Sequence, residues 1–318
     1  MGFLHAGILR GRLGVRRIAW HVPGNVDHEL GSVTVLFGDK NGKYPHGNSL
    51  RVRGTDGIAI VDPSLALVER AAEFRDRADL VVLSHVHEDH VAGVGLFPRA
   101  DVRVHREDVL GIRSIEGLQQ IYGYALPQQL LEEWVVGSFH YCPRADARGF
   151  DDGEVFDLGG TTIRAFHLPG HTRGHSALLV EPDGVLFLGD IDLTGFGPYY
   201  GDAWSNLEDF ERSLAAIASI PARAWVSFHH VGLIEDRRVF DEKLARFTGR
   251  IAERDVAIET YLAEPRTIEE MVAHRFLYPP HVTLPFIDAV ERRTIEQHLS
   301  RAVARGRVVS DGERYYAQ

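Results

Sequence analysis

The chain has 318 residues, of which 44% are hydrophobic and 25% charged, and its formal net charge is −10. This length and composition are typical of a globular protein with one large domain and room for a small second one. The acidic balance argues against general binding of nucleic acid or of an anionic membrane, and no apolar run is long enough for a transmembrane helix. The single cysteine, Cys142, excludes an intrachain disulfide and is expected to be a small buried residue.

The first ten residues carry no recognisable targeting signal. Their apolar stretch is too short for a signal peptide, and no charged region precedes it. Gly2 matches the start of a myristoylation motif, but Ala6 occupies the position that requires Ser or Thr. We therefore expect a cytoplasmic protein without a membrane partner.

Short segments rich in β-branched and other apolar residues, separated by Gly- and Asp-containing turns, predict the strands in the first third of the chain. They cover residues 32–37, 48–53, 57–61, 79–83 and 102–105. Asp62 ends the third strand, and Ser64 is placed to cap a helix over 65–77 that carries an apolar stripe. The mixture of strands and helices predicts an α/β (α+β) protein.

The strand over 79–83 runs directly into His85-Val-His-Glu-Asp-His90, which places four metal-ligand side chains within six residues. Alternate side chains of an extended segment share a face, so His85 and His87 can point the same way. Apolar residues at helix-like intervals over 91–97 predict a helix that starts near Asp89. Such a helix would direct Asp89 and His90 elsewhere, toward a second centre. The alternative interpretation is a loop of solvated histidines.

Residues 107–140 predict a pair of helices, and Pro127 is suited to the start of the second. This stretch interrupts an otherwise strand-rich pattern. It is either a cap that shapes a pocket or a pair of helices in the outer layer, and the sequence favours neither. His105, just before it, is expected to be a strand residue and not a ligand.

The second half of the chain returns to strands and ends its first domain with helices. Strands are predicted over 161–167, 176–181, 185–189 and 223–228. A Ser205–Glu208 capping box predicts a helix over 206–219, and a long amphipathic helix follows over 235–255.

Further ligand candidates follow these strands. His171 lies in a Pro-Gly-His turn, Asp190 follows the strand over 185–189, and the pair His229 and His230 follows the strand over 223–228. With the first cluster they supply the side chains for two metal centres. A catalytic zinc takes three protein ligands and keeps one position open. Histidine and carboxylate ligands without thiolate fit zinc, and also iron or manganese.

Residues 256–318 predict a separate small domain after a catalytic domain over 1–255. Helices are predicted near 267–274 and 288–305, followed by two strands around the Asp311-Gly312 turn. The order of helix, helix and two-stranded wing is that of a winged-helix-like domain. Eight Arg and no Lys in 261–318 face eight acidic residues, so this segment is neutral and lacks the charge of a nucleic-acid-binding domain.

The motif His85-x-His87-x-Asp89-His90 resembles the signature of the metallo-β-lactamase superfamily. The stretch around His171 and the Gly-Asp190 turn resemble the next two motifs of that superfamily. The resemblance spans roughly residues 30–255. It implies a four-layer αββα sandwich with a metal pair at the edge of its two sheets.

The resemblance also implies a role for each matching position. The first metal would take His85, His87 and His171. The second would take Asp89, His90 and the last histidine, with Asp190 bridging. The register relative to the strand over 223–228 favours His229 over the alternative His230. Asp62 matches a position that supports the ligand loop, whereas His175 matches a structural one; Asp192 and His167 are expected to shape a loop and a strand.

Such a site implies hydrolysis of an ester, thioester, lactone or amide by a metal-bridging hydroxide, with Asp89 orienting the hydroxide and moving a proton. We expect two divalent ions, zinc in the first place and manganese or iron as alternatives, and a small-molecule substrate. Three tyrosines are the first candidates for the substrate pocket: Tyr122, Tyr199 and Tyr200. Tyr124 could line it as well, or any of the four could donate a hydrogen bond to an oxyanion, and ordinary packing is the alternative for each.

Other activities of the superfamily provide the alternatives. Nucleases of this superfamily are expected to carry an extra domain that clamps the nucleic acid. The interval from Asp190 to His229 is too short for such a domain, so a nuclease is disfavoured. A mononuclear iron dioxygenase of a thiol-derived substrate uses overlapping ligands and remains the main alternative. The neutral tail argues against a DNA-binding regulator, and a role of the tail in forming a homo-oligomer stays open.

Overall fold

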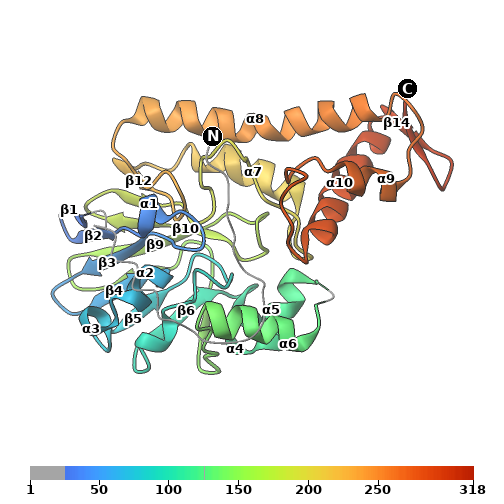
Figure 1. The fold of residues 1–318 in the computed structure, drawn as a ribbon. Helices are drawn as coiled ribbons and strands as arrows, with labels where there is room; N and C mark the ends of the chain where they lie inside the picture. Colours follow the sequence, from blue (N-terminus) through green and yellow to red (C-terminus); the bar gives the residue numbers. More distant parts are fainter. Residues whose placement is uncertain (1–25, 125) are drawn as a thin grey trace.

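The computed structural model describes residues 26–124 and 126–318. Over these ranges the chain forms two facing sheets with helices outside them, and a tail lies to one side (Figure 1). The prediction about targeting signals concerns residues 1–10, which lie outside the described residues.

The first sheet has the strand order β1-β2-β3-β4-β5-β6-β7 within the described chain. Its strands are β1 (His28–Leu30), β2 (Val33–Leu36), β3 (Ser49–Arg53), β4 (Ile58–Val61), β5 (Leu80–Val82), β6 (Asp101–His105) and β7 (Arg148–Phe150). Neighbours from β1 to β4 are antiparallel, and those from β4 to β7 are parallel. The strands predicted in this region are confirmed, and β1 and β7 are additional short strands.

The second sheet has the order β13-β12-β11-β10-β9-β8 in the part of the chain that is described. Its strands are β8 (Val155–Asp157), β9 (Thr162–His167), β10 (Ser176–Glu181), β11 (Val185–Phe187), β12 (Ala224–Val226) and β13 (Leu233–Ile234). β11 and β12 are parallel, and the other neighbours are antiparallel. The predicted strands are again present, and β8 and β13 are additional.

Side-chain alternation along the central strands produces four layers. In β5, Leu80 and Val82 face the core between the sheets, whereas Val81 faces the cluster beneath the outer helices. In β10, Leu178 faces the same central core and Leu179 faces the helices on the opposite side. Each strand is therefore apolar on both faces, which is what an αββα sandwich requires.

The helices of the sandwich are shorter than their predicted spans on the first sheet and close to them on the second. They are α2 (Leu65–Glu69), α3 (Ala71–Phe74), α4 (Val109–Arg113), α5 (Ile115–Tyr122), α6 (Gln128–Glu132), α7 (Leu207–Ile217) and α8 (Arg237–Tyr261). A left-handed turn at Asp39–Gly42 carries the label α1, and a π-helical segment, η2 (Glu133–Ser138), follows α6. The helix expected over 65–77 is interrupted at Arg70, which has a non-helical backbone.

Two local predictions are wrong. Residues 91–97 hold only a short 3-10 turn, η1 (Val94–Leu96), because the chain after His90 turns back to reach the first sheet. Ser205 does not cap α7; Asn206 does, by accepting a hydrogen bond from the Asp209 amide at 2.8 Å. The Ser205 hydroxyl instead donates to the His171 carbonyl at 2.6 Å, so it supports a ligand loop.

The tail contains the predicted elements and has its own small core. α9 (Ile268–His274) and α10 (Ile287–Ala304) are followed by the antiparallel pair β14 (Val308–Ser310) and β15 (Tyr315–Ala317). Met271, Ile295 and Leu299 lie in an apolar cluster that includes Ile258 at the end of α8. In Figure 1 the long α8 crosses the top of the molecule and leads directly into this tail, past the boundary predicted at 255.

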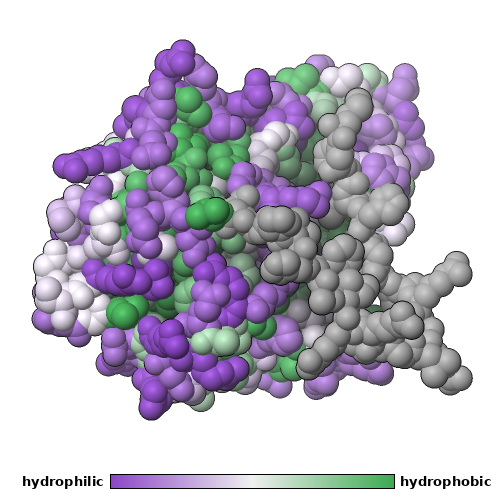
Figure 2. All heavy atoms as spheres, turned by 60° about the vertical axis from the view of Figure 1, so that its left-hand side comes forward, coloured by the Kyte–Doolittle hydropathy of each residue, from purple (hydrophilic) through white to green (hydrophobic). Residues whose placement is uncertain are grey.

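The surface is mainly hydrophilic on the side where β1 and β2 lie in Figure 1. Figure 2 shows this side, with hydrophobic residues visible in a band through its middle. No helix among the described residues is long and apolar enough to cross a membrane. Cys142 is exposed, so the prediction of a buried cysteine is wrong. Neighbours on both sides, Tyr141 and Arg144, take the buried positions of this segment instead.

The two sheets meet at a pair of stacked histidines, one at the end of β6 and one at the end of β9. The ring centroids of His105 and His167 are 3.8 Å apart, with 7° between their planes. Burial, His167 and Arg106 lower the pKa of His105 to about 4, against an opposing contribution from Asp152. Both histidines are strand residues, as predicted.

We expect His105 to make the fold less stable in mild acid. The unfolded chain has an ordinary histidine pKa of about 6.5, so it binds more protons than the folded chain between that pH and about 4. Stability should therefore rise with pH across this window, and His105→Gln should reduce the slope. Urea unfolding at several pH values measures it, with the exposed His281→Gln as control. An unchanged slope in His105→Gln would contradict the assignment.

Candidate metal centre

The predicted ligands lie on four loops that meet at one edge of the sandwich. His85, His87, Asp89 and His90 follow β5, and His171 lies in the loop between β9 and β10. Asp190 follows β11 and His229 follows β12. Each loop leaves a strand that is hydrogen-bonded into one of the two sheets, so the sheets bring these side chains together from distant parts of the chain.

Three imidazoles and one carboxylate form the first cluster. Nδ1 of His87 lies 3.1 Å from Nε2 of His85 and 3.0 Å from Nε2 of His171. An oxygen of Asp190 lies 3.3 Å from the same His171 nitrogen. These donor atoms are close enough to one another to hold a single metal ion.

The second cluster contains Asp89, His90 and His229. Nε2 of His229 lies 2.9 Å from Asp89 Oδ2, and Nε2 of His90 lies 2.9 Å from Asp190 Oδ1. Asp190 thus directs one oxygen to each cluster. This is the geometry expected of a carboxylate that lies between two cations.

The hydrogen bonds of the imidazole rings show whether the site fits a cation. Nδ1 of His171 donates to the Tyr199 carbonyl at 2.9 Å, and Nδ1 of His229 donates to the Gly42 carbonyl at 2.9 Å. A neutral imidazole that donates from Nδ1 has only a lone pair on Nε2. Lone pairs that face one another and carboxylates at about 3 Å repel unless a proton or a metal cation lies between them. The donor set therefore fits divalent metal ions, and its oxygen and nitrogen atoms suit several of them.

Asp62 supports the site from below. Its side chain accepts a hydrogen bond from the Ser84 amide at 2.6 Å and contacts Nδ1 of His90 at 2.7 Å. It is fully buried, and its φ of +43° is the left-handed backbone that ends β4. Although Asp62 lies within reach of His85 and His90, both of its oxygens are engaged by these supporting contacts.

Neighbouring charges in the site counteract the effect of burial on the pKa values of its residues. Burial by itself would raise the pKa of Asp190, but His90 and His229 lower it well below its ordinary value. Burial opposes protonation of His229, yet Asp190 and Asp89 raise the pKa of this histidine to about 9. The two carboxylates thus favour positive charge at Nε2 of His229, either as a proton or as a bound cation that takes the place of the proton.

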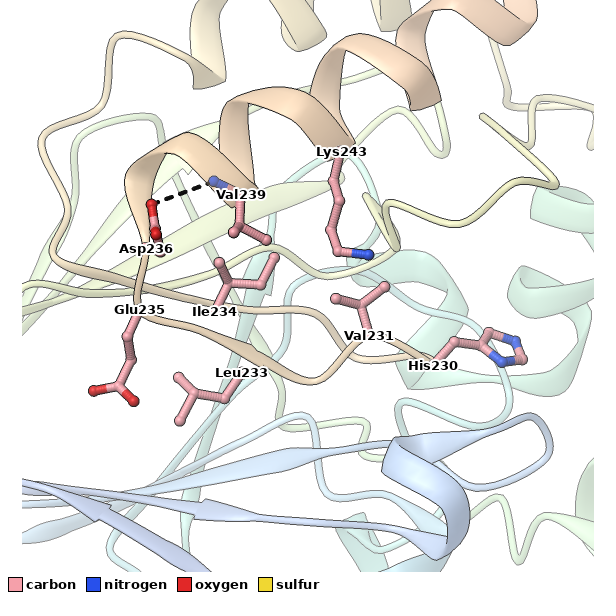
Figure 3. Close-up of a pocket in the computed structure, with 8 residues that line it drawn as sticks. All are labelled: His230, Val231, Leu233, Ile234, Glu235, Asp236, Val239 and Lys243. Atoms are coloured by element: carbon pink, nitrogen blue, oxygen red, sulfur yellow. Dashed lines mark hydrogen bonds between the residues drawn. The ribbon is translucent and has the colours of Figure 1, made fainter.

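The neighbouring candidates lie outside the two clusters. His230 is exposed and lines a surface pocket with Lys243, beside β13 and the start of α8 (Figure 3). Asp192 accepts a hydrogen bond from the Thr194 amide at 2.9 Å and shapes its loop, as predicted. His175 accepts from the Asp190 amide at 3.1 Å, which is a supporting role.

The three candidate pocket tyrosines have different surroundings. The Tyr122 ring stacks on His87 at 5.2 Å, and Tyr199 lies beside His171, with a centroid distance of 5.7 Å. Tyr200 is fully buried in the core of the second sheet, where its hydroxyl contacts His298 at 2.8 Å. Packing is therefore the role of Tyr200. The insertion over 107–140 contributes both outer-layer helices and, through Tyr122, a contact with the site.

Two buried carboxylates beside the ligands were missed from the sequence. Glu88 lies between the hydroxyls of Tyr44, at 3.1 Å, and Tyr122; burial and Asp89 raise its pKa to about 7. Asp202 lies 2.9 Å from Nε2 of His87. Glu88 stands inside the His85–His90 motif, where its position could have drawn attention, but nothing local distinguishes Asp202.

The family model of the metallo-beta-lactamase superfamily matches residues 44–244. The chain belongs to this superfamily. A solved structure of a metallo-beta-lactamase family protein from Thermus thermophilus resembles it with a TM-score of 0.68 at 25% identity, covering 91% of this chain and 99% of that chain. Because both coverages are high, the likeness includes the tail as well as the sandwich.

Curated relatives include enzymes named as hydrolases. An atrochrysone carboxyl ACP thioesterase of Aspergillus fumigatus is 27% identical over 74% of this chain and 67% of its own length. A hydroxyacylglutathione hydrolase of Methylococcus capsulatus is 31% identical over 56% of this chain and 58% of its own length. An acyl-coenzyme A thioesterase of Gallus gallus is 26% identical over 58% of this chain and 72% of its own length. Together with the family match, these relatives identify the chain as a hydrolase, as predicted.

Metal analysis of three variants tests the assignment of the ligands. Protein purified without added metal should hold close to two divalent ions per chain, as counted by mass spectrometry. His229→Ala should lose about one ion, because it removes a ligand of one cluster only, and Asp190→Ala should lose at least as much. His230→Ala is the matched control and should keep both ions. One iron per chain, unchanged in His229→Ala, would contradict the binuclear assignment and favour the dioxygenase.

Proposed function

We propose that the chain is a binuclear metal-dependent hydrolase that cleaves thioester bonds of acyl substrates. The observation that carries this proposal is the pair of facing donor clusters, with Asp190 directing one oxygen to each. The names of the curated relatives, two of which are thioesterases, support the thioester among the four bond types expected from the sequence.

The residues divide between two ions, for which zinc is the first choice. His85, His87 and His171 would hold one, and Asp89, His90 and His229 would hold the other. A bound metal pair supplies a water of lowered pKa and polarises the acyl carbonyl. The chain itself supplies the rigid strand ends that keep the two clusters at a fixed separation.

Asp89 is the proposed catalytic residue. One of its oxygens contacts His229 at 2.9 Å, and the other lies 3.9 Å from Nε2 of His90. Burial would raise the pKa of Asp89, but His90 and His229 lower it, so the carboxylate is ionised and can accept a proton. In hydrolysis, the water oxygen bonds to the acyl carbon as Asp89 takes its proton. The carbon–sulfur bond then breaks, and Asp89 passes the proton to the leaving thiolate, which gives a carboxylic acid and a thiol and leaves Asp89 ionised again.

The two tyrosines beside the site shape its wall. The Tyr122 hydroxyl is engaged by Glu88, and the Tyr199 hydroxyl donates to Asp202 at 3.0 Å. Neither hydroxyl is therefore available to a substrate oxygen, and we assign the aromatic rings to the substrate-facing wall. For the tail, the order of α9, α10, β14 and β15 supports a winged-helix-like domain over 256–318.

Asp89→Asn should reduce kcat for an acyl thioester by about 100-fold or more, because the amide cannot accept the proton. Thiol release from acyl-coenzyme A and acyl-carrier-protein substrates, followed with a thiol reagent, measures it. His230→Asn, which changes an exposed residue outside both clusters, is the matched control.

A comparison with esters and lactones of the same acyl group tests the substrate class. We expect kcat/KM to be highest for the thioester. A lactone or ester that is hydrolysed at least tenfold more efficiently would overturn the assignment to thioesters, but the assignment as a hydrolase would still hold. Oxygen consumption with a thiol substrate, without hydrolysis of any of these bonds, would overturn the hydrolase itself.

A further inference from the structure

The outer nitrogen of His87 has a buried carboxylate as its neighbour. Nε2 of His87 lies at an ion-pair distance of 2.9 Å from Oδ2 of Asp202, and within the described chain neither atom has a partner of hydrogen-bond geometry. Both residues are buried, with exposed fractions of 7% and 2%. A carboxylate in this place holds the imidazole ring in position and directs the Nδ1 lone pair of His87 toward the first cluster.

Asp202 is itself held by two tyrosines. Its Oδ1 accepts hydrogen bonds from the hydroxyls of Tyr124 and Tyr199, the latter at 3.0 Å. The rings continue this connection as a stack. Tyr122 lies on His87, and Tyr124 lies on Tyr122 with 5.4 Å between centroids and 9° between planes.

The C-terminal helix α10 holds the segment that carries these tyrosines. The Arg293 guanidinium donates to the carbonyl of Tyr122 at 2.9 Å and to that of Gly123. It also lies 5.7 Å from the centre of the Tyr124 ring. Phe286, directly before α10, stacks on the Tyr124 ring with 5.2 Å between centroids. The tail thus fixes Tyr124 through its backbone and through its ring.

We propose that Arg293 and Tyr124 are positioning residues through which α10 sets His87 for metal binding. Arg293 holds the backbone beside Tyr124, the Tyr124 hydroxyl orients Asp202, and Asp202 orients His87. The tail is then a working part of the metal centre. The proposal rests on the metal centre of the proposed function and is independent of the substrate.

The alternative is that α10 only packs against the sandwich. A separate buried network already joins the two, because Arg301 on α10 forms an ion pair with Asp255 at 2.7 Å and with Glu211 at 2.8 Å. Attachment of the tail therefore does not require Arg293. The packing role predicts a loss of stability in Arg293 variants, whereas the positioning role predicts a change at the metal.

Binding of Co²⁺ to the metal-free protein separates the two roles, because Co²⁺ absorbs visible light according to its ligands. Tyr124→Phe keeps the ring and removes the hydroxyl, and Arg293→Met keeps the length and removes the donors. Both variants should bind one of the two Co²⁺ ions about tenfold more weakly, which is the loss of affinity expected when an outer partner of a metal ligand is removed. Both should also shift the Co²⁺ absorption bands. Arg293→Lys should recover part of the loss. Arg292→Met is the matched control, since Arg292 pairs with Glu269 inside the tail and should bind like wild type.

The outcomes distinguish this proposal from the proposed function. Wild-type affinity and spectrum in folded Tyr124→Phe and Arg293→Met would overturn it, and thermal unfolding shows which variants are folded. If Arg293→Met does not fold, Tyr124→Phe alone decides. A wild-type chain that binds Co²⁺ but cleaves no thioester would overturn the proposed substrate class and leave this inference standing. A wild-type chain that binds no Co²⁺ would overturn both.

Discussion

The inward lone pairs of the histidines are the constraint on which the site depends. Carbonyls outside the site accept the Nδ1 protons of His171 and His229, so their Nε2 atoms face inward as acceptors. Acceptors that converge in a buried place need a proton or a cation between them. Much of the structure near the site serves to hold these acceptors still: Asp62 below His90, Ser205 on the His171 loop and His175 on the Asp190 amide.

The sandwich explains how distant parts of the chain reach one site. The two sheets present the ends of β5, β11 and β12 at a common edge, and each of these strands is buried on both faces. Buried strands do not shift, because a movement of one residue would place polar groups in the core. The loops after them therefore inherit a fixed geometry, and the ligands need not be adjacent in sequence.

The parts outside the sandwich also reach this edge. The insertion contributes Tyr122 and Tyr124, and the tail holds both through Arg293 and Phe286. Asp202 connects this aromatic group to His87. The Thermus thermophilus structure matches 91% of the chain, so that protein has a tail beside its sandwich as well.

The sequence by itself determined the family, most strands and the residues that the structure gathers into the two clusters. Each depends on local signals: the His85–His90 spacing, runs of β-branched residues and turn residues. It could not place β7, β8 or the true cap of α7, since their residues have weak local preferences and are fixed by contacts with other segments. It favoured His229 over His230, and the structure brings only His229 of the two into a cluster. The roles of Glu88, Asp202 and Arg293 were decided by tertiary structure alone. Each has partners far away in the chain: Glu88 and Tyr122 are 34 positions apart, and Arg293 and Tyr122 are 171 apart. A pattern of neighbouring residues cannot indicate contacts over such distances.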